Sequence, residues 1–339
     1  MHALSNTLYE KHTSFASNPL LLSMMLLTYD EHSNIPEQLT DFYEQAFLTL
    51  FNIHDTRKNF IREIHSKLEY GPFKAVFANF CFKTYYNGQF KFSEALLLDY
   101  LNKIKTSTGI DFSVQGYCYD LKNLVCMIVN EGVHLRFIHR SFQEYFAAVH
   151  TITLSDNIQK RILRPLLDGT RRYREYLQLL ENLECERYRQ NLILPVFRDI
   201  KRQYDKNQQS ITWIITKLFS GISLHLEPDS NKNDIWLGWR STSTAYNEVV
   251  HYLARKQGYV KRIRPEREKA CDELTDYMKR NSISELSFLK AEKVGMLNTV
   301  FAASSWVNDW FGDALAAYEQ YERKNLKKQK NIKDLINEL

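Results

Sequence analysis

Residues 137–148, with the sequence FIHRSFQEYFAA, decide the local fold in the middle of this 339-residue chain. Ser141 is followed three residues later by Glu144 and by aromatic residues at helical spacing, so we expect a capping box and a helix that begins at about Phe142. His139 then lies just before a helix N-terminus, where unpaired backbone N–H groups and the helix dipole favour an anion such as phosphate. An imidazole in that place can donate a further hydrogen bond. The other interpretation is that His139 only ends a strand and donates to a neighbouring carbonyl.

The residues before this stretch alternate between helical and extended patterns. Two β-rich runs are joined by Asn130-Glu131-Gly132, which predicts a hairpin. Helix, short strand, helix, helix and hairpin is the order of a winged helix, with the hairpin as its wing. The expected segments, in chain order, are residues 73–81, 89–92, 93–104, 114–124, 125–129 and 133–138.

The beginning of the chain predicts a pair of helices. Asn18 is a favoured N-cap and Pro19 suits the first helical position, where its missing N–H has no consequence. Residues 20–27 are apolar on nearly every side and must be buried in a larger assembly. After Pro36, residues 39–50 show a second helical pattern with one apolar face. We expect a small helical domain here.

Beyond residue 155 the pattern is helical almost throughout, so we expect an all-α C-terminal domain. Residues 173–183 and 211–219 each predict an apolar helix face, with breaks at Gly169, at Pro195 and at residues 227–231. All five tryptophans lie in this part of the chain, where core packing is their expected role. The whole chain is therefore expected to be mainly α, with domains at 1–55, 56–155 and 156–339.

Composition indicates an ordinary cytoplasmic protein. No apolar run is long enough to span a bilayer, and the first residues lack the features of a signal peptide. Residues 1–150 carry 13 Lys+Arg and 15 Asp+Glu, whereas the remainder carries 32 and 25, which indicates a boundary near residue 150. The five cysteines are scattered without a C-x-x-C pair, so we expect reduced thiols and no zinc site.

The sequence supports no catalytic site and no metal ligands. It contains no G-x-x-x-x-G-K-[ST], G-x-S-x-G or H-E-x-x-H motif. A winged helix can bind DNA, but its third helix has only Lys122, opposite Asp120, and the wing adds only Arg136, which leaves that surface nearly neutral. The basic clusters at 171–174 and 261–264 lie outside it and are either solvated faces or surfaces for nucleic acid or an acidic partner.

Two segments together resemble a known family. Residues 18–29 (NPLLLSMMLLTY) and 35–47 (IPEQLTDFYEQAF), followed about 90 residues later by residues 135–148 (LRFIHRSFQEYFAA), resemble the second half of the NACHT module of STAND signalling ATPases. This class includes NLR immune receptors and bacterial NACHT antiviral defence proteins. The first part is similar to the helical domain that follows the nucleotide-binding fold, and the last part is similar to the winged-helix domain.

The resemblance implies two nucleotide contacts. Pro19 matches the family's proline that packs against adenine, and His139 matches the histidine of the F-x-H-x-[ST]-F-Q-E-[FY] motif, which contacts the β-phosphate of ADP and locks the resting state. The expected cofactor is ADP or ATP with Mg²⁺ in an intact parent protein, with none bound independently. The expected partners are the missing P-loop domain, further copies on activation, and a protein or nucleic-acid trigger at the C-terminal domain.

The P-loop and the Mg²⁺-binding acids of the family are missing from the sequence. We therefore expect a fragment of a longer ATPase, without ATPase activity of its own, whose helical and winged-helix domains close over ADP and control oligomerisation. Two alternatives are a stand-alone scaffold that docks on a separate P-loop ATPase and a winged-helix DNA-binding regulator.

Overall fold

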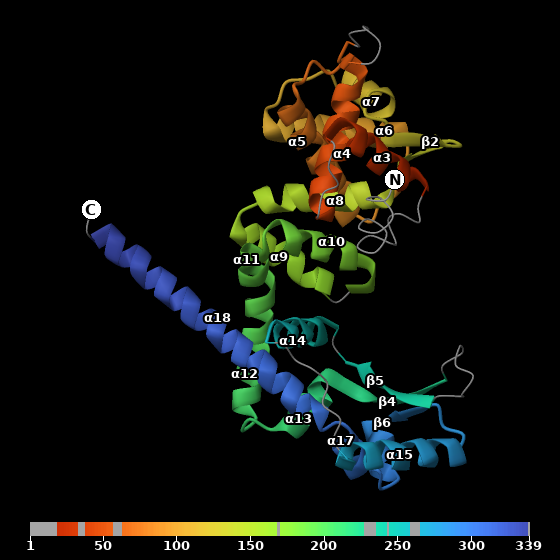
Figure 1. Ribbon diagram of the computed structural model, residues 1–339, viewed down its shortest axis with the longest axis vertical. Helices are drawn as coiled ribbons and strands as arrows, with labels where there is room; N and C mark the ends of the chain where they lie inside the picture. Colours follow the sequence, from red (N-terminus) through yellow and green to blue (C-terminus); the bar gives the residue numbers. More distant parts are fainter. Residues whose placement is uncertain are drawn as a thin grey trace. The chain divides into compact units, whose positions relative to one another are not determined.

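The structure of the chain is a computed structural model, and it describes residues 19–32, 38–56, 63–167, 170–226, 235–242, 244–257 and 265–337. These residues form two compact units (Figure 1). The first contains the described residues up to Ser155 together with Arg174–Glu186, and the second contains Asp156–Tyr173 and the described residues from Arg187 onward. The predictions for Asn18, Pro36, Gly169, residues 227–231 and residues 261–264 lie outside the described residues.

The first unit is built on helices that share an aromatic core. Phe47 of α4 stacks on Phe77 of α5 at 5.3 Å between ring centroids and lies 4.6 Å from Phe146 of α8. All three side chains are fully buried. The helices up to Thr153 are α3 (Pro19–His32), α4 (Leu39–Thr56), α5 (Tyr70–Tyr86), α6 (Glu94–Thr108), α7 (Val114–Asn123) and α8 (Arg140–Thr153).

A small antiparallel sheet lies beside these helices. The strands β1 (Lys91–Phe92), β2 (Ile128–Glu131) and β3 (His134–Phe137) follow the spatial order β1-β3-β2. The predicted hairpin is present, but its loop is Gly132-Val133, because Asn130 and Glu131 still pair with Leu135 and His134 in the strands. Gly132 begins that loop with a φ of 62°, a conformation that glycine adopts without steric cost.

The helix caps of this unit follow the sequence closely. Ser93 caps α6, because its hydroxyl accepts a hydrogen bond from the Leu96 N–H, as its position before the helical pattern predicts. Ser113 caps α7 in the same way through the Gly116 N–H. At the other end of α6, Gly109 adopts a left-handed conformation and its N–H donates to the Lys105 carbonyl.

The second unit is not all-α, so that prediction is wrong. It contains a three-stranded antiparallel sheet of β4 (Phe219–Leu226), β5 (Ile235–Ser241) and β6 (Glu285–Ser287) in the order β5-β4-β6. The predicted helix over residues 211–219 ends at Leu218, and β4 begins directly at Phe219. No turn residue lies between the end of the helix and the start of the strand. The apolar residues of the helix continue into the strand, so the sequence pattern does not show where one ends and the other begins.

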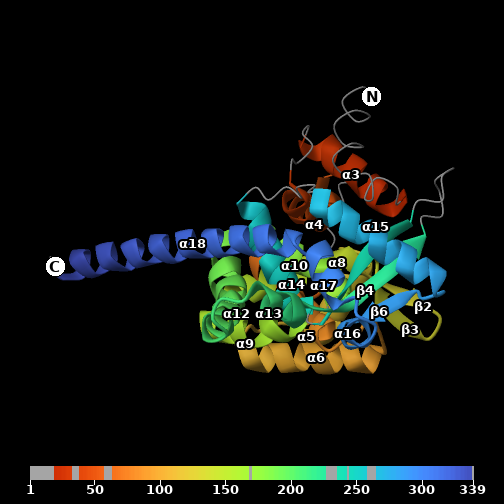
Figure 2. The ribbon, with the colours of Figure 1, turned by 90° about the horizontal axis from the view of Figure 1, so that it is seen from below.

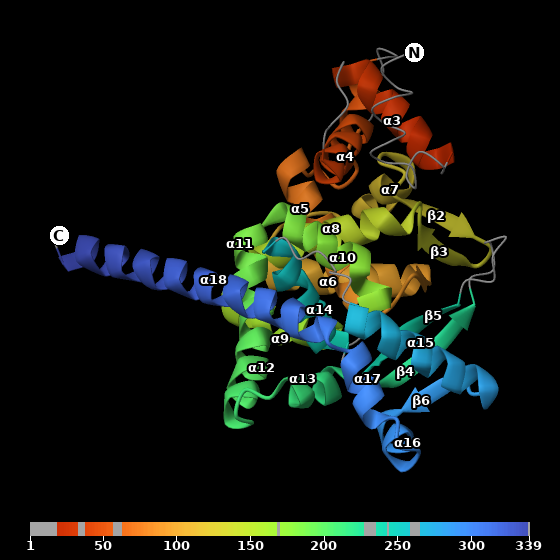
Figure 3. The same ribbon diagram turned by 60° about the horizontal axis from the view of Figure 1, so that its bottom comes forward.

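Helices cover this sheet and complete the second unit. Ile222 and Leu286 of the sheet share a buried core with Leu274 and Met278 of α15, which lies alongside the strands in Figure 3. The remaining elements are α9 (Asp156–Leu167), α10 (Thr170–Leu183), α11 (Cys185–Tyr188), the π-helical turn η2 (Arg189–Ile193), α12 (Leu194–Lys206), α13 (Ile211–Leu218), α14 (Thr244–Lys256), α15 (Pro265–Arg280), α16 (Phe288–Lys293), α17 (Leu297–Ala303) and α18 (Trp306–Asn337). The part of α10 from Arg174 onward and the part of α11 up to Glu186 belong to the first unit. The predicted break at Pro195 is wrong, because Pro195 lies in the first turn of α12, which follows η2 without interruption and where a missing N–H is tolerated.

Tryptophans contribute to the core of the second unit, as predicted. Trp239, Trp306 and Trp310 form a ring cluster with Phe219, with centroid separations between 5.3 and 6.3 Å. The first half of α18 packs on α14, and its second half extends away from the rest of the unit (Figure 2). None of the helices within the described ranges is both long enough and apolar enough to cross a membrane.

Candidate functional site

His139 is itself the N-cap of α8, which corrects the predicted capping box. The helix begins at Arg140, two residues earlier than expected, and His139 has the extended backbone of a cap (φ −147°, ψ 141°). Its imidazole Nδ1 accepts a hydrogen bond from the Ser141 N–H at 3.2 Å. The reason is the hairpin: the N–H of Ile138 still donates to the carbonyl of Met127, so the chain stays extended up to His139 and turns into the helix there.

This cap fixes the tautomer of His139. An N–H group can only donate, so Nδ1 must be the acceptor nitrogen and, in the neutral ring, Nε2 carries the proton. The Ser141 hydroxyl also lies 2.7 Å from Nδ1. Burial, followed by the nearby guanidinium of Arg136, lowers the pKa of His139 below its usual value of 6.5. At neutral pH the half-buried imidazole is therefore uncharged and presents an Nε2–H donor.

Two arginines lie near the imidazole, and each is paired with a carboxylate. Arg136 donates to the carbonyls of Phe137 and Ile138, which holds its guanidinium at the end of β3. Arg140 lies over the ring of Phe90, 4.4 Å from its centroid, and pairs with Glu144 one turn along α8 at 2.8 Å. Glu144 thus neutralises Arg140. It does not accept a hydrogen bond from the Ser141 backbone N–H, which a capping box would require.

Helix α4 holds the start of α8 in place, a contact that the sequence patterns do not reveal. Tyr43 stacks on Tyr145 at 5.0 Å and meets Phe142 edge-on at 5.1 Å. Burial raises the pKa of the Tyr43 hydroxyl, and its hydrogen bond to Ser141 partly offsets that rise. Since Ser141 also contacts His139 Nδ1, the Tyr43 hydroxyl, the Ser141 hydroxyl and the imidazole form one chain of polar contacts.

Glu44, the residue after Tyr43, joins three helices. Its carboxylate accepts hydrogen bonds from Tyr70 (2.9 Å) and Lys74 (2.6 Å) of α5 and from Tyr145 (3.1 Å) of α8. The only sequence signal for this network is a lone acidic residue between aromatic residues of a helical pattern. The Glu44 carboxylate thus links α4 to α5 and α8, the two helices on which the candidate site is built.

Pro19 lies where the sequence places it, at the first residue of α3, and it is exposed. Its carbonyl accepts from the Ser23 hydroxyl at 2.8 Å. Within the described part of the chain, no hydrogen bond joins Pro19 to His139, and α3 packs on α4. The two predicted nucleotide contacts belong to the same unit, and no hydrogen bond between them is found among the described residues.

The basic residues of the possible DNA-binding surface are already paired. Lys122 of α7 lies 3.0 Å from the Glu94 carboxylate, and Arg136 lies 3.2 Å from that of Glu131. Asp120 accepts from the backbone N–H groups of His65 and Ser66, so it anchors α7 internally. Pairing removes much of the positive charge that phosphate contacts need. Among the described residues, no group of three or more His, Cys, Asp or Glu side chains is arranged to hold a metal ion.

Comparison with known families adds an independent observation from the other half of the chain. Residues 182–339 match the model of SNaCT7, the short NACHT-associated C-terminal domain, family 7. The C-terminal part of this chain is thus similar to domains that accompany NACHT modules. The predicted resemblance to the C-terminal part of a NACHT protein is confirmed, since it was drawn from residues 18–148, outside the matched region. No curated protein and no solved structure matches the chain.

Proposed function

We propose that this chain is the regulatory part of a NACHT-type STAND ATPase of antiviral defence, in which it helps to hold a resting, ADP-bound state. The observation that carries the proposal is the conjunction of the NACHT-associated match over residues 182–339 with the environment of His139. In this proposal residues 56–155 are a winged-helix domain. Their order of elements and their sheet order β1-β3-β2 support that assignment.

The chemistry around His139 fits a phosphate. A neutral imidazole with Nε2–H donates to a phosphate oxygen without needing a proton from solvent. The N-terminus of α8 adds its dipole, whereas Arg136, although close enough to lower the pKa of the imidazole, is paired with Glu131. Bound nucleotide would supply the phosphate, while Tyr43 and Ser141 keep the imidazole in its donor tautomer. Release of this contact on exchange of ADP for ATP would free the winged helix for oligomerisation.

His139→Ala in a full-length parent protein that includes the P-loop domain tests this role. We expect weaker ADP binding, by about tenfold for the loss of one charge-assisted hydrogen bond, and constitutive activity. ADP affinity and the oligomeric state without a trigger are the measurements. His134→Ala, an exposed histidine on the same strand-to-helix segment, is the matched control and should behave as the unmodified protein. Unchanged ADP affinity and an unchanged resting state in His139→Ala would contradict the assignment.

A further inference from the structure

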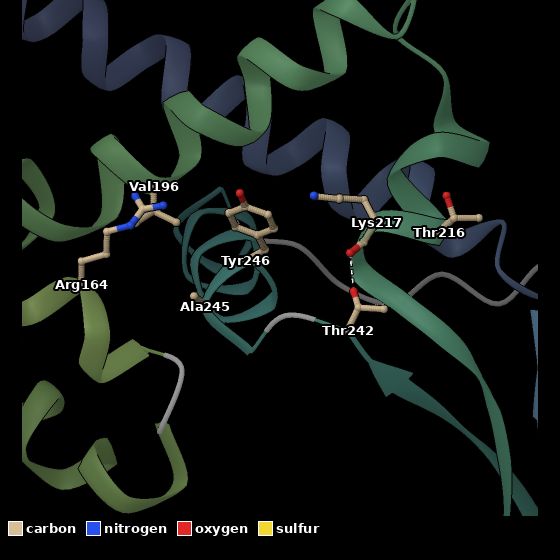
Figure 4. Close-up of a pocket in the computed structure, with 7 residues that line it drawn as sticks. All are labelled: Arg164, Val196, Thr216, Lys217, Thr242, Ala245 and Tyr246. Atoms are coloured by element: carbon tan, nitrogen blue, oxygen red, sulfur yellow. Dashed lines mark hydrogen bonds between the residues drawn. The ribbon is translucent and has the colours of Figure 1, made fainter.

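The second unit contains a cavity of about 460 Å³ that the role of His139 does not use. It is formed by elements far apart in the sequence and is drawn in Figure 4. Its lining consists of two cationic side chains, three hydroxyl-bearing side chains and two small apolar ones: Arg164, Val196, Thr216, Lys217, Thr242, Ala245 and Tyr246. A cavity of this volume lies within the range of small-molecule sites.

The cationic groups approach the cavity from two helices. Arg164 extends from α9 and Lys217 from α13, and Figure 4 shows Tyr246 of α14 between their charged ends. The Lys217 ammonium lies 5.5 Å from the centre of the Tyr246 ring. No carboxylate within the described ranges forms an ion pair with Lys217. Its positive charge is therefore available to a ligand.

One carboxylate lies close to the cavity but does not cancel its charge. Asp199 is bonded at 2.8 Å by both Arg202 and the Tyr246 hydroxyl, whereas Arg164 stays 3.9 Å away. The Tyr246 hydrogen bond, with Arg202 and Arg164, lowers the pKa of Asp199, and burial together with Asp199 raises the pKa of Tyr246. Tyr246 thus remains neutral at pH 7. Arg164 and Arg202 are the cations near Asp199, whereas Lys217 lies against the Tyr246 ring.

The hydroxyl groups indicate what else the ligand carries. The Thr216 hydroxyl donates to the Trp213 carbonyl, and the Thr242 hydroxyl donates to the Lys217 carbonyl, the contact drawn as a dashed line in Figure 4. With their hydrogens used in this way, both oxygens remain acceptors. They suit a ligand with hydroxyl groups of its own, while the two cations suit a phosphate.

We propose that this cavity binds a small phosphorylated polyol, a nucleotide or a sugar phosphate, with Arg164 and Lys217 on the phosphate and Thr216 and Thr242 accepting from the hydroxyl groups. The site lies wholly in the second unit, and its ligand would give the C-terminal region a small-molecule input separate from the nucleotide at His139. A negative result for His139 would therefore not count against this cavity, and a negative result for the cavity would not count against His139.

Isothermal titration calorimetry on the whole chain at low ionic strength tests the site with three probes: adenosine 5′-monophosphate, ribose 5-phosphate and inorganic phosphate. We expect the two esters to bind more tightly than inorganic phosphate. Lys217→Met and Arg164→Gln should each weaken ester binding at least tenfold, and Lys217→Arg should retain it. Stronger binding of the nucleotide than of ribose 5-phosphate assigns the ligand to the nucleotides, and equal binding assigns it to sugar phosphates.

Matched variants separate a specific site from general surface charge. Arg161→Gln on the exposed side of α9 and Lys206→Met at the end of α12 remove the same charges outside the cavity, and they should leave binding unchanged. Circular dichroism confirms that each variant folds. Equal losses in the control variants, no binding of either ester, or tighter binding of a phosphoserine peptide than of both esters would overturn the proposal.

Discussion

His139 and His150 lie near opposite ends of α8, and burial keeps both imidazoles uncharged at neutral pH. Their surroundings differ. His139 is a cap with one nitrogen bonded to the backbone, whereas His150 lies against Phe82, with 5.1 Å between ring centroids. Burial, assisted by the positive charge of Lys83, lowers the pKa of His150 to about 4. The first position suits a ligand contact, and the second is part of the packing.

His150 predicts a pH dependence of stability in the first unit. As pH falls below 6.5, the unfolded chain takes up a proton at this residue before the folded chain does, so the free energy of unfolding decreases until the pH reaches about 4. The loss between pH 7 and pH 4 is on the order of 2–3 kcal/mol. His150→Phe keeps a ring in the same place and removes this contribution, so the variant should lose less stability on acidification.

Urea unfolding followed by circular dichroism at pH 7 and pH 4 measures this difference. All five tryptophans lie in the second unit, so tryptophan fluorescence follows that unit separately and serves as an internal control. An equal loss in the variant and the unmodified chain would show that His150 is not the titrating group.

The second sheet depends on the close approach of two strands at Gly221. The register of β4 against β5 shifts between Phe219 and Gly221, and Gly221 pairs with Ser287 of β6. A Cβ atom on Gly221 would lie 2.3 Å from the Leu286 carbonyl oxygen, a backbone atom that cannot move without breaking the pairing. Glycine is therefore required here for space.

Gly221→Ala should destabilise the second unit by about 2–3 kcal/mol through this clash. Gly312→Ala is the matched control, because Gly312 is exposed in α18 and nothing lies within 4 Å of a Cβ atom placed there. Alanine favours a helix over glycine, so this control should stabilise by about 0.5–1 kcal/mol. Urea unfolding followed by tryptophan fluorescence distinguishes the two variants. Comparable midpoints would mean that the strands can separate at no cost.

For the whole molecule, residues 182–339 match a NACHT-associated domain, and the sequence contains no G-x-x-x-x-G-K-[ST] motif. We expect the purified chain to hydrolyse no ATP, since a phosphate-cradling loop and its Mg²⁺ ligands are needed for phosphoryl transfer. Phosphate release measured over several hours tests this, with a parent protein that contains the P-loop domain as the positive control. ATP turnover that co-purifies with the chain and is unaffected by further purification would refute the expectation.

Some features of the fold followed from local sequence. The hairpin turn at Gly132, the Ser93 cap and the helix start at Pro19 could be predicted, because each depends on residues within four positions of one another. The NACHT resemblance was also present in short motifs. His139 itself was found in this way, as a histidine before a helical pattern.

Contacts between distant residues decided the rest. The strand pairing of β3 carries the extended chain up to His139, so the histidine and not Ser141 became the cap. β6 pairs with β4 across more than 60 residues, and no local periodicity marks that pairing. The cavity brings Arg164 and Lys217 into one lining although 53 positions separate them. Local patterns report only the preferences of neighbouring residues, whereas these features depend on which surfaces meet once the chain has folded.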